Sequence, residues 1–378
     1  MATSIFYMSL ALIFYTFLGY PLLLFILSLF IRREVIRNDI RPEVTVIIPV
    51  HNEEHSIGAK IKNCLGFDYP REKLKIIIAS DGSTDKTEEI VNRFESEQVQ
   101  FLSLPQRGGK VVAQNHAVQI CDTEIIIFTD VAILTRPDCV RLVVQNFAGK
   151  EIGCVSCRDI IIDEKSEGEG SYIRYDMTVR KYASQIASIT GVTGGFYAVR
   201  KEIAEHGWNP AFPPDFYVAI KCIRQGLRVV EDARVCAHYK ATARGRDELQ
   251  RKVRTINRGM HALFSSPNRD LLNPFKYGFV SIQLISHKLL RWSVPFFLIS
   301  LFLSNLMILD ESVLTAFFFL IQLSLYLSAL LAFLSKKKIN SSLLKFVLYF
   351  AVANLAILKA WYEVAIGKEY VIWQPTKR

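Results

Sequence analysis

Three acidic residues occupy equivalent places in the first half of the sequence. Glu53, Asp81 and Asp130 each stand at or just beyond the end of a short apolar run rich in β-branched residues, at 44–50 (VTVIIPV), 75–80 (KIIIAS) and 124–129 (EIIIFT). Such runs are typical of strands covered on both faces of a parallel sheet. Ligands of these sheets bind at the carboxyl ends of the strands, so we expect the three acids to share one crevice. A ribose, a base edge and a divalent metal carrying a diphosphate would together offset their repulsion.

Other polar residues near these acids have simpler readings. Ser83 or Asp85 can cap the helix that follows the second run. Gly108 and Gly109 let the backbone approach a ligand closely, and Lys110 can reach a uracil carbonyl or a phosphate, although the three residues alone also fit a surface turn. They do not form a P-loop, because that motif needs Ser or Thr after the lysine and a valine stands there.

The apolar runs alternate with helical stretches, and this order predicts the fold class. It indicates right-handed βαβ units in an α/β domain with a mainly parallel sheet. The seven cysteines are irregularly spaced, which is typical of a reducing compartment. Cys154 and Cys157 have CxxC spacing in a predicted strand without a second ligand pair, so we expect a buried structural pair, with zinc or redox chemistry as the alternative.

Hydrophobic residues make up 51% of the chain and gather at its ends. Residues 1–31 contain no charged side chain, and this segment is long enough for a tilted spanning helix, kinked at Pro21 and retained as an anchor. A charged middle region follows. A channel or transporter would instead place ionisable groups within several spans, so this partition argues against that class.

Apolar segments return after Tyr277. Residues 273–291 mix apolar and basic side chains, which predicts an interfacial helix, or else the start of a spanning helix. We expect two transmembrane helices within 292–334, joined at Asp310 and Glu311. Residues 343–378 are expected to form a short membrane or interfacial segment and a C-terminal tail.

The net charge of +10 is placed where it indicates orientation. Arg32, Arg33 and Arg37 follow the first apolar segment, and the lysines at 336–338 follow a later one. Basic residues favour the cytoplasmic side of a membrane. We therefore expect a multi-pass protein of the inner (cytoplasmic) membrane with its middle region in the cytosol. No signature of a nucleic-acid-binding module is present, so nucleic acid is not an expected partner.

The chain resembles the family 2 glycosyltransferases, which have the GT-A nucleotide-sugar fold. The resemblance covers residues 42–259 and includes VIIPVHNEE, IIIASDGSTDKT, GGK, IIIFTD, TGGFYAVRKE, PPDFYVAIKCIRQGLRVV and RKVRTINRG. SHKLLRW and the terminal WQPTKR are similar to the membrane-bound bacterial branch related to cellulose, hyaluronan and poly-N-acetylglucosamine synthases. The resemblance implies a cytosolic GT-A domain at residues 42–260.

The resemblance also implies roles for individual residues. Glu53 and Asp81 would hold the uridine part of a UDP-sugar, with Lys110 nearby. Asp130 matches the first acid of the Asp-x-Asp motif that binds Mg²⁺ or Mn²⁺. Asp215 matches the general base that takes the proton of the acceptor hydroxyl.

Two basic residues follow in the same comparison. Arg251 and Arg254 match the basic positions of the Q/R-x-x-R-W motif, near the diphosphate and the acceptor. They share one face of a helix, because they are three residues apart. The alternative for them is a solvated basic helix against the membrane.

The sequence departs from the family pattern at three positions. Ala132 replaces the second acid of Asp-x-Asp, so Asp130 is the one acid of this motif that can bind the metal. His238, much later in the sequence, is a candidate second ligand, with a structural role as the alternative. Pro214 stands before Asp215, where the family has another acid. Thr255 replaces the tryptophan that helps to line the acceptor terminus in processive synthases.

We therefore expect an inverting transfer of one sugar from the nucleotide-sugar to a lipid-linked or glycan acceptor presented at the membrane, in cell-surface polysaccharide or glycan synthesis. Polysaccharide-assembly proteins are candidate partners. The alternatives are a small processive polysaccharide synthase and a catalytically degenerate nucleotide-sugar-binding scaffold.

Overall fold

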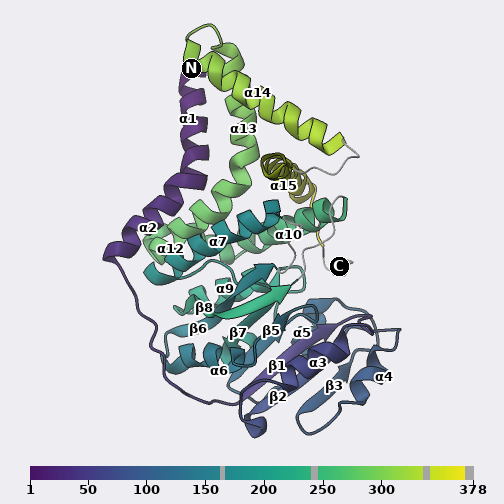
Figure 1. Ribbon diagram of the computed structural model, residues 1–378. Coiled ribbons are helices and arrows are strands. Elements are labelled where there is room, and N and C mark those ends of the chain that lie inside the picture. Colours follow the sequence, from purple (N-terminus) through teal and green to yellow (C-terminus); the bar gives the residue numbers. More distant parts are fainter. Residues whose placement is uncertain (162–166, 240–245, 335–340, 371–378) are drawn as a thin grey trace.

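The computed structural model describes residues 1–161, 167–239, 246–334 and 341–370. The lysines at 336–338 and the terminal WQPTKR at 373–378, which entered the sequence analysis, lie outside these ranges. Within them, a sheet with helices on both faces lies below a group of long apolar helices (Figure 1).

One sheet forms the centre of the lower region. Its strand order in the described chain is β3-β2-β1-β4-β7-β6-β8-β5. Strands β3, β2, β1 and β4 are parallel, β7 is antiparallel to β4 and β6, β6 is parallel to β8, and β5 is antiparallel to β8. The predicted α/β class with a mainly parallel sheet is confirmed. The strands are β1 (Val44–Val50), β2 (Leu74–Ser80), β3 (Val99–Ser103), β4 (Ile125–Thr129), β5 (Leu134–Thr135), β6 (Ile152–Ile161), β7 (Phe196–Arg200) and β8 (Arg228–Tyr239).

The first strand is apolar throughout because both of its faces are covered. Val46 and Ile48 enter one hydrophobic core, whereas Ile47 enters the core on the other face. Three helices supply the first core: α3 (Ile57–Leu65), α4 (Thr87–Asn92) and α6 (Cys139–Val144). The second core receives α5 (Lys110–Gln119), α7 (Glu167–Ile186), α8 (Lys201–Ala204) and α9 (Pro214–Arg224).

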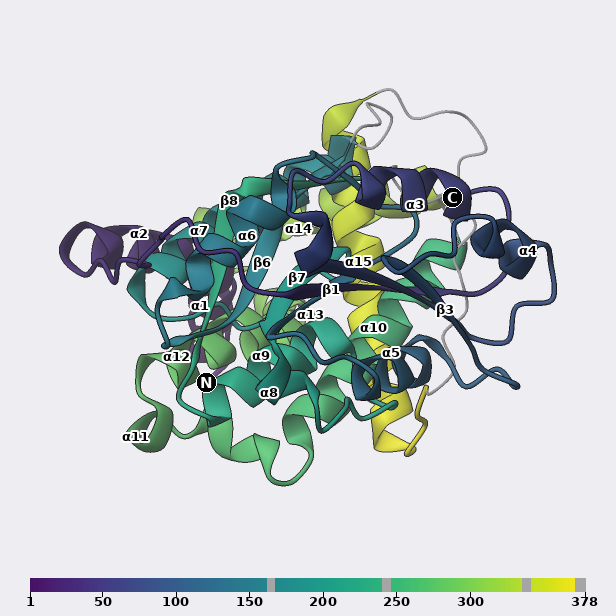
Figure 2. The same ribbon diagram turned by 90° about the horizontal axis from the view of Figure 1, so that it is seen from below.

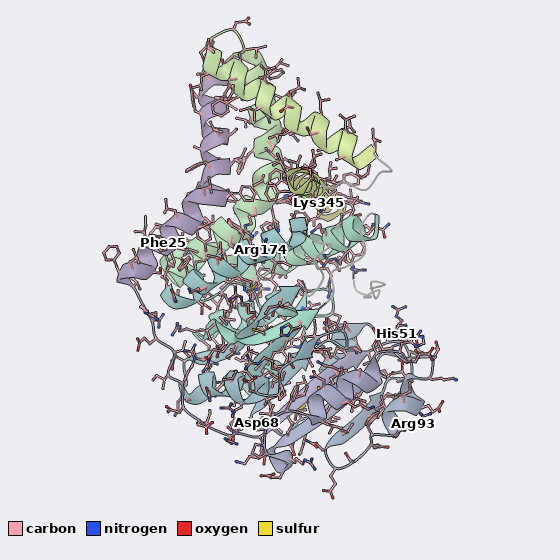
Figure 3. All side chains as sticks on the ribbon, in the orientation of Figure 1. Phe25, His51, Asp68, Arg93, Arg174 and Lys345 are labelled. Atoms are coloured by element: carbon pink, nitrogen blue, oxygen red, sulfur yellow. The ribbon has the colours of Figure 1, made fainter. Side chains whose placement is uncertain are left out.

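Helices at both ends of the chain are long and apolar enough to cross a membrane, as judged by length and composition. Figure 3 shows that the sticks on these helices are almost entirely carbon, whereas nitrogen and oxygen atoms are frequent on the lower region. In the described chain these candidate spans are Ala2–Phe30, Phe279–Met307, Val313–Leu334 (α14) and Ser342–Ala365 (α15).

Two of the candidate spans contain a π-helical turn. Ala2–Phe30 consists of α1 (Ala2–Phe14), the π turn η1 (Tyr15–Gly19) and α2 (Tyr20–Phe30), and it bends between α1 and α2 near Pro21 (Figure 1). Phe279–Met307 consists of α12 (Phe279–Leu284), the π turn η5 (Ile285–Leu289) and α13 (Leu290–Met307). Residues 279–291 thus continue without a break into the helix that follows. The two π turns meet where the hydroxyls of Tyr15 and Ser286 lie 2.9 Å apart.

A layer of helices separates the sheet from α1 and α13. Figure 1 views α15 along its axis, whereas α1 and α13 run within the plane of the picture, so α15 lies across their direction. In Figure 2 the same helix extends across the molecule. It packs on α10 (Arg246–Phe264) and α7. The short helices η4 (Asn268–Leu272) and α11 (Pro274–Tyr277) follow α10 in the chain. Arg174 of α7 and Lys345 of α15, both labelled in Figure 3, lie in the helical layer.

A buried arginine joins the first apolar helix to the sheet. The guanidinium of Arg228, which is 5% exposed, donates to the carbonyls of Ala187, Glu34, Arg33 and Ser184 at distances of 3.0, 3.3, 3.1 and 3.1 Å. Two of these carbonyls belong to the segment that follows α2, and two lie at or just beyond the end of α7. One side chain therefore fixes the linker against the domain.

We expect Arg228→Met to lower the Tm of the detergent-solubilised protein by about 5 °C or more, because it leaves buried carbonyls without donors. Arg71→Met, on the exposed helix η2 (Arg71–Lys73), is the matched control and should leave the Tm nearly unchanged. The measurement is thermal unfolding followed by circular dichroism. Equal Tm values for the two variants would show that Arg228 does not fix the linker against the domain.

Candidate functional site

Asp81 organises the glycine loop. It follows β2 and is 2% exposed; Oδ1 accepts from the backbone N–H groups of Gly108 and Gly109 at 2.7 and 2.9 Å, and Oδ2 accepts from Gly109 at 2.9 Å. Gly109 has φ 98°, a conformation that side chains disfavour. The carboxylate therefore fixes the backbone from which Lys110 begins α5.

Lys110 connects this loop to the next acid. Its ammonium group forms an ion pair with the carboxylate of Asp130, directly after β4. The Asp130 side chain is 29% exposed and the lysine 16% exposed. The backbone N–H of Asp130 also donates to the carbonyl of Gly195 at 3.1 Å, so the acid is tied to the loop before β7.

Asp215 lies on the other side of that loop. It stands in the first turn of α9, where the helix dipole favours a carboxylate. The backbone N–H of Val192 donates to its carbonyl at 2.9 Å, and a Cβ on Gly194 would lie 3.6 Å from its Oδ2. Contacts thus run from Asp81 through the glycine loop to Lys110, then to Asp130, and through residues 192–195 to Asp215. This chain of contacts links the three acids.

Glu53 stands at the same edge of the sheet. Its backbone N–H donates to Thr87 Oγ1 at 2.9 Å, and its carbonyl accepts from the first turn of α3. The neighbouring Asn52 has φ 55° and accepts from the N–H of Thr84 at 2.8 Å. His51, labelled in Figure 3, pairs through Nδ1 with the carbonyl of Asp81 at 2.8 Å. The loops after β1 and β2 therefore support one another beside the crevice.

The predicted arginines lie on α10, in the layer next to the apolar helices. Burial and the nearby charge of Arg251 lower the pKa of Arg254, which still remains a cation at neutral pH. One turn further on, Arg258 donates to the carbonyls of Pro210, Ala211 and Phe212, just before α9, at 2.9, 3.2 and 2.6 Å. Arg258 is a positioning residue for Asp215 that the sequence analysis did not single out.

His238 stands in β8 and pairs in register with Leu134 of β5, four residues beyond Asp130. Within the described ranges, no group of three or more His, Cys, Asp and Glu side chains is arranged to hold a metal ion. A contribution of His238 to metal binding stays a prediction.

A cavity of about 1400 Å³ extends from Asp215 toward the apolar helices. Its polar part includes Asp215, Arg251, Thr255 and Lys288. Apolar side chains of α1, α13, α14 and α15 form most of its remaining wall. The proposed base therefore faces a space that is continuous with the candidate membrane spans.

Residues 45–208 match the family described as glycosyl transferase family 2. The chain carries a family 2 glycosyltransferase domain. The chain is similar to the mannosyltransferase PcManGT from Pyrobaculum calidifontis, solved in complex with GDP-Man and Mn²⁺, with a TM-score of 0.74 and 21% sequence identity. This likeness covers 98% of this chain and 100% of that one, and it establishes the fold.

Two curated relatives act in glycolipid and polysaccharide synthesis by their names. The β-monoglucosyldiacylglycerol synthase of Nostoc sp. is 26% identical over 178 residues, which cover 44% of this chain and 38% of the relative. The poly-β-1,6-N-acetyl-D-glucosamine synthase of Staphylococcus aureus is 25% identical over 166 residues, which cover 43% and 40%. The chain thus matches less than half of the length of either relative.

Lys60 lies beneath the loop that carries Asp130 and binds residues on both sides of it. It is fully buried, and its Nζ donates to Thr129 Oγ1 at 2.9 Å and to the carbonyl of Ile133 at 2.6 Å. Burial lowers the pKa of Lys60. The lysine thereby holds both ends of the loop that carries Asp130. A sequence signal existed, because Lys60 falls within the apolar stripe of α3 formed by Ile57, Ile61 and Cys64.

Asp159 is a further acid near Asp130 and Asp215, and sequence reasoning missed it because it lies within a strand, β6. Burial raises the pKa of Asp159 to about 7. The nearby cation Arg180 opposes this shift, whereas Asp176, Asp130 and Asp215 add to it. The glycosyltransferase domain thus contains a carboxyl group that changes its charge near neutral pH.

This pKa gives a signed prediction. The folded-state pKa of Asp159 lies above the unfolded value of about 3.9, so the wild type loses stability as the pH rises from about 4 to 7. Asp159→Asn removes this loss. The Tm of the variant should equal that of the wild type near pH 4, exceed it by several degrees at pH 7, and keep that difference above pH 7.

The scans are run in EDTA without nucleotide, and Asp68→Asn, at an exposed aspartate labelled in Figure 3, is the control. Parallel Tm curves for Asp159→Asn and the wild type would show that Asp159 does not titrate in this range.

Proposed function

We propose that this chain is a membrane-bound inverting glycosyltransferase that moves one sugar from a nucleotide-sugar to a lipid-linked acceptor. The observation that carries the proposal is the cavity that joins Asp215 to the apolar helices. In this proposal, a donor site beside Asp130 and an apolar space for a lipid would meet at the carboxylate of Asp215. A soluble enzyme with a soluble acceptor has no need of the second space.

The donor would occupy the crevice beside the glycine loop. Asp81 fixes the backbone of this loop, and Lys110 reaches from it to the carboxylate of Asp130. The ammonium group of a lysine is suited to a diphosphate. Glu53, at the end of β1, would face the nucleoside. The family resemblance favours a UDP-sugar, whereas the structural relative was solved with GDP-Man, so both classes belong in the assay.

Asp130 is suited to a divalent cation, Mg²⁺ or Mn²⁺. Carboxylate oxygen is a preferred ligand of these ions, and the pairing of Asp130 with the ammonium of Lys110 marks the place as one where a cation is favoured. A bound ion would offset the charge of the departing diphosphate. Since Ala132 supplies no second carboxylate, diphosphate oxygens and water would have to supply further ligands.

Asp215 would act as the base. The acceptor hydroxyl loses its proton to the carboxylate as its oxygen bonds to the anomeric carbon, and the bond from that carbon to the diphosphate breaks. Arg258 fixes the chain before α9 and so holds the base in place. Arg251 and Arg254 would attract the anionic parts of the donor and acceptor.

Thr255 favours a lipid acceptor over a growing glycan. It lines the cavity at the position where processive synthases carry a tryptophan. A threonine offers no large face for a sugar ring to stack on. One relative, the β-monoglucosyldiacylglycerol synthase, is by its name an enzyme that makes a glycolipid.

We expect Asp215→Asn to reduce sugar transfer and donor hydrolysis by at least a thousandfold while donor binding stays within about threefold. Asp130→Ala should lower both donor binding and turnover. The assays use native membranes with a panel of UDP- and GDP-sugars and Mg²⁺ or Mn²⁺. Asp68→Asn is the matched control and should behave as wild type. Equal donor turnover by Asp215→Asn and the wild type would favour the non-catalytic scaffold.

The orientation is tested by labelling single cysteines with an impermeant maleimide. His55→Cys lies at an exposed site of the sheet domain, and Asp310→Cys lies in the turn between α13 and α14. We expect His55→Cys to react only after cells are permeabilised, because the arginines after α2 favour the cytosol. Asp310→Cys should react in intact cells. The reverse pattern would reject a cytosolic catalytic domain.

A further inference from the structure

Lys288 lines the proposed acceptor cavity beside Asp215 without forming an ion pair within the described residues. It stands on the π turn η5 and lines the cavity. Its Nζ lies 5.1 Å from the ring centroid of Phe216, and a Cβ on Gly191 would be 3.7 Å from it. Within the described residues, its ammonium group forms neither a hydrogen bond nor an ion pair.

The neighbouring polar side chains behave differently. His287 and Arg291 each bond the same oxygen of Asp176 at 3.1 Å, and Arg291 also donates to the hydroxyl of Tyr172 at 3.0 Å. Burial raises the pKa of Asp176, but the bond from His287 and the two neighbouring cations outweigh burial and hold this pKa well below its usual range. This carboxylate is therefore committed to its own cluster. Asp176 and Asp215 attract the ammonium group of Lys288 electrostatically, but within the described residues neither forms an ion pair or a hydrogen bond with it.

The position of Lys288 relates it to the reacting atoms. Phe216, beneath its ammonium group, follows Asp215 in the chain, and Gly191 precedes the residue whose N–H bonds Asp215. Lys288 and Asp215 therefore border the same end of the cavity. A π turn is an uncommon device that often marks functional positions, and η5 carries this lysine in a helix otherwise suited to a membrane.

We propose that Lys288 binds a phosphate-type head group on the lipid acceptor, while the apolar part of the cavity holds the lipid tail. This deepens the proposed function and rests on it for the identity of the cavity as the acceptor site. A partly buried ammonium over an aromatic ring gains most from an anion that it can donate to directly. A neutral head group would give that ammonium group no anion to donate to directly.

The proposed ligand of the cavity is a membrane lipid, because apolar side chains form most of the cavity wall. Phe17, Leu298, Ile321 and Ala353 come from four different helices and line one space with the polar end. A free phosphate would contact none of these side chains. The charge and the apolar wall together select a molecule with both parts.

The test measures lipid binding by the full-length protein in micelles of a neutral maltoside detergent. The probes are hexadecyl phosphate and hexadecanol, which share a tail and differ in charge. We expect the wild type to bind the phosphate at least tenfold more tightly. Lys288→Met should remove this preference and leave hexadecanol binding unchanged, which also reports that the variant is folded. Lys288→Arg should retain most of the preference.

Lys276→Met is the control variant. Lys276 is an exposed lysine paired with Asp270 outside the cavity, so its loss should leave the preference as in the wild type. Equal binding of the two lipids by the wild type would overturn the proposal, and this comparison needs no variant. The proposal would also be overturned if Lys288→Met kept the full preference for hexadecyl phosphate over hexadecanol.

The same preparations are titrated with UDP- and GDP-sugars, which separates this inference from the proposed function. If no nucleotide-sugar binds while the phosphate preference depends on Lys288, the glycosyltransferase proposal fails and the anionic lipid site stands. If donors bind and react but the lipid preference is absent, the site at Lys288 fails and the transferase proposal stands.

Discussion

Carboxylates gathered at one edge of a sheet must be prevented from repelling one another, and the architecture of this site follows from that constraint. Each acid is offset in a different way. Asp81 is bound by backbone N–H groups, Asp130 by the ammonium of Lys110, and Asp215 stands at the amino end of α9. Only Asp81 is fully committed, since its oxygens are bound within the fold. Asp130 remains partly exposed, so its partner can be exchanged when a ligand arrives.

These offsets also explain why the site depends on loops that are far apart in the sequence. The glycine loop before α5 delivers Lys110, and the loop before β7 separates Asp130 from Asp215. Lys60 holds the loop after β4 from the buried side, at some cost because its charge is desolvated. A polar site on mobile loops would lose its geometry. Here the hydrogen bonds of buried groups fix each loop to the sheet.

The sequence predicted the part of this arrangement that depends on periodicity. Apolar runs located the strands, and the position of an acid after each run located the edge at which they meet, because parallel strands all end on the same side. Pairing between side chains and distant backbone is not encoded in any period. The burial of Asp81 under the glycine loop and the proximity of Asp159 therefore emerged only from the folded chain. Lys60 was detectable, since a lysine within an apolar helix stripe signals a buried partner.

The segment after Tyr277 shows how a correct observation can support an incomplete reading. Its basic residues were interpreted as part of a helix at the membrane interface, because cations near apolar sequence commonly lie there, with the start of a spanning helix as the alternative. In the fold, His287 and Arg291 turn inward to share Asp176, and Lys288 faces the cavity. The same composition fits both arrangements; the distinction lies in whether a carboxylate elsewhere in the chain is close enough to pair. Asp176 comes from α7, more than a hundred residues earlier, so only the tertiary structure could reveal it.

Because these side chains point inward, the helical layer forms the polar end of the cavity. α7 and α10 contribute charged residues such as Asp176 and Arg251 to the cavity, whereas the residues that α1, α13, α14 and α15 contribute are mostly apolar. A lipid with a charged head can match that difference only if the base lies at the polar end. Asp215 meets this condition, because α9 begins directly beneath the layer and Arg258 of α10 binds the chain that leads into it. α10 therefore holds the chain that leads to the proposed base and also borders the proposed lipid space, which would couple the position of the acceptor to proton transfer.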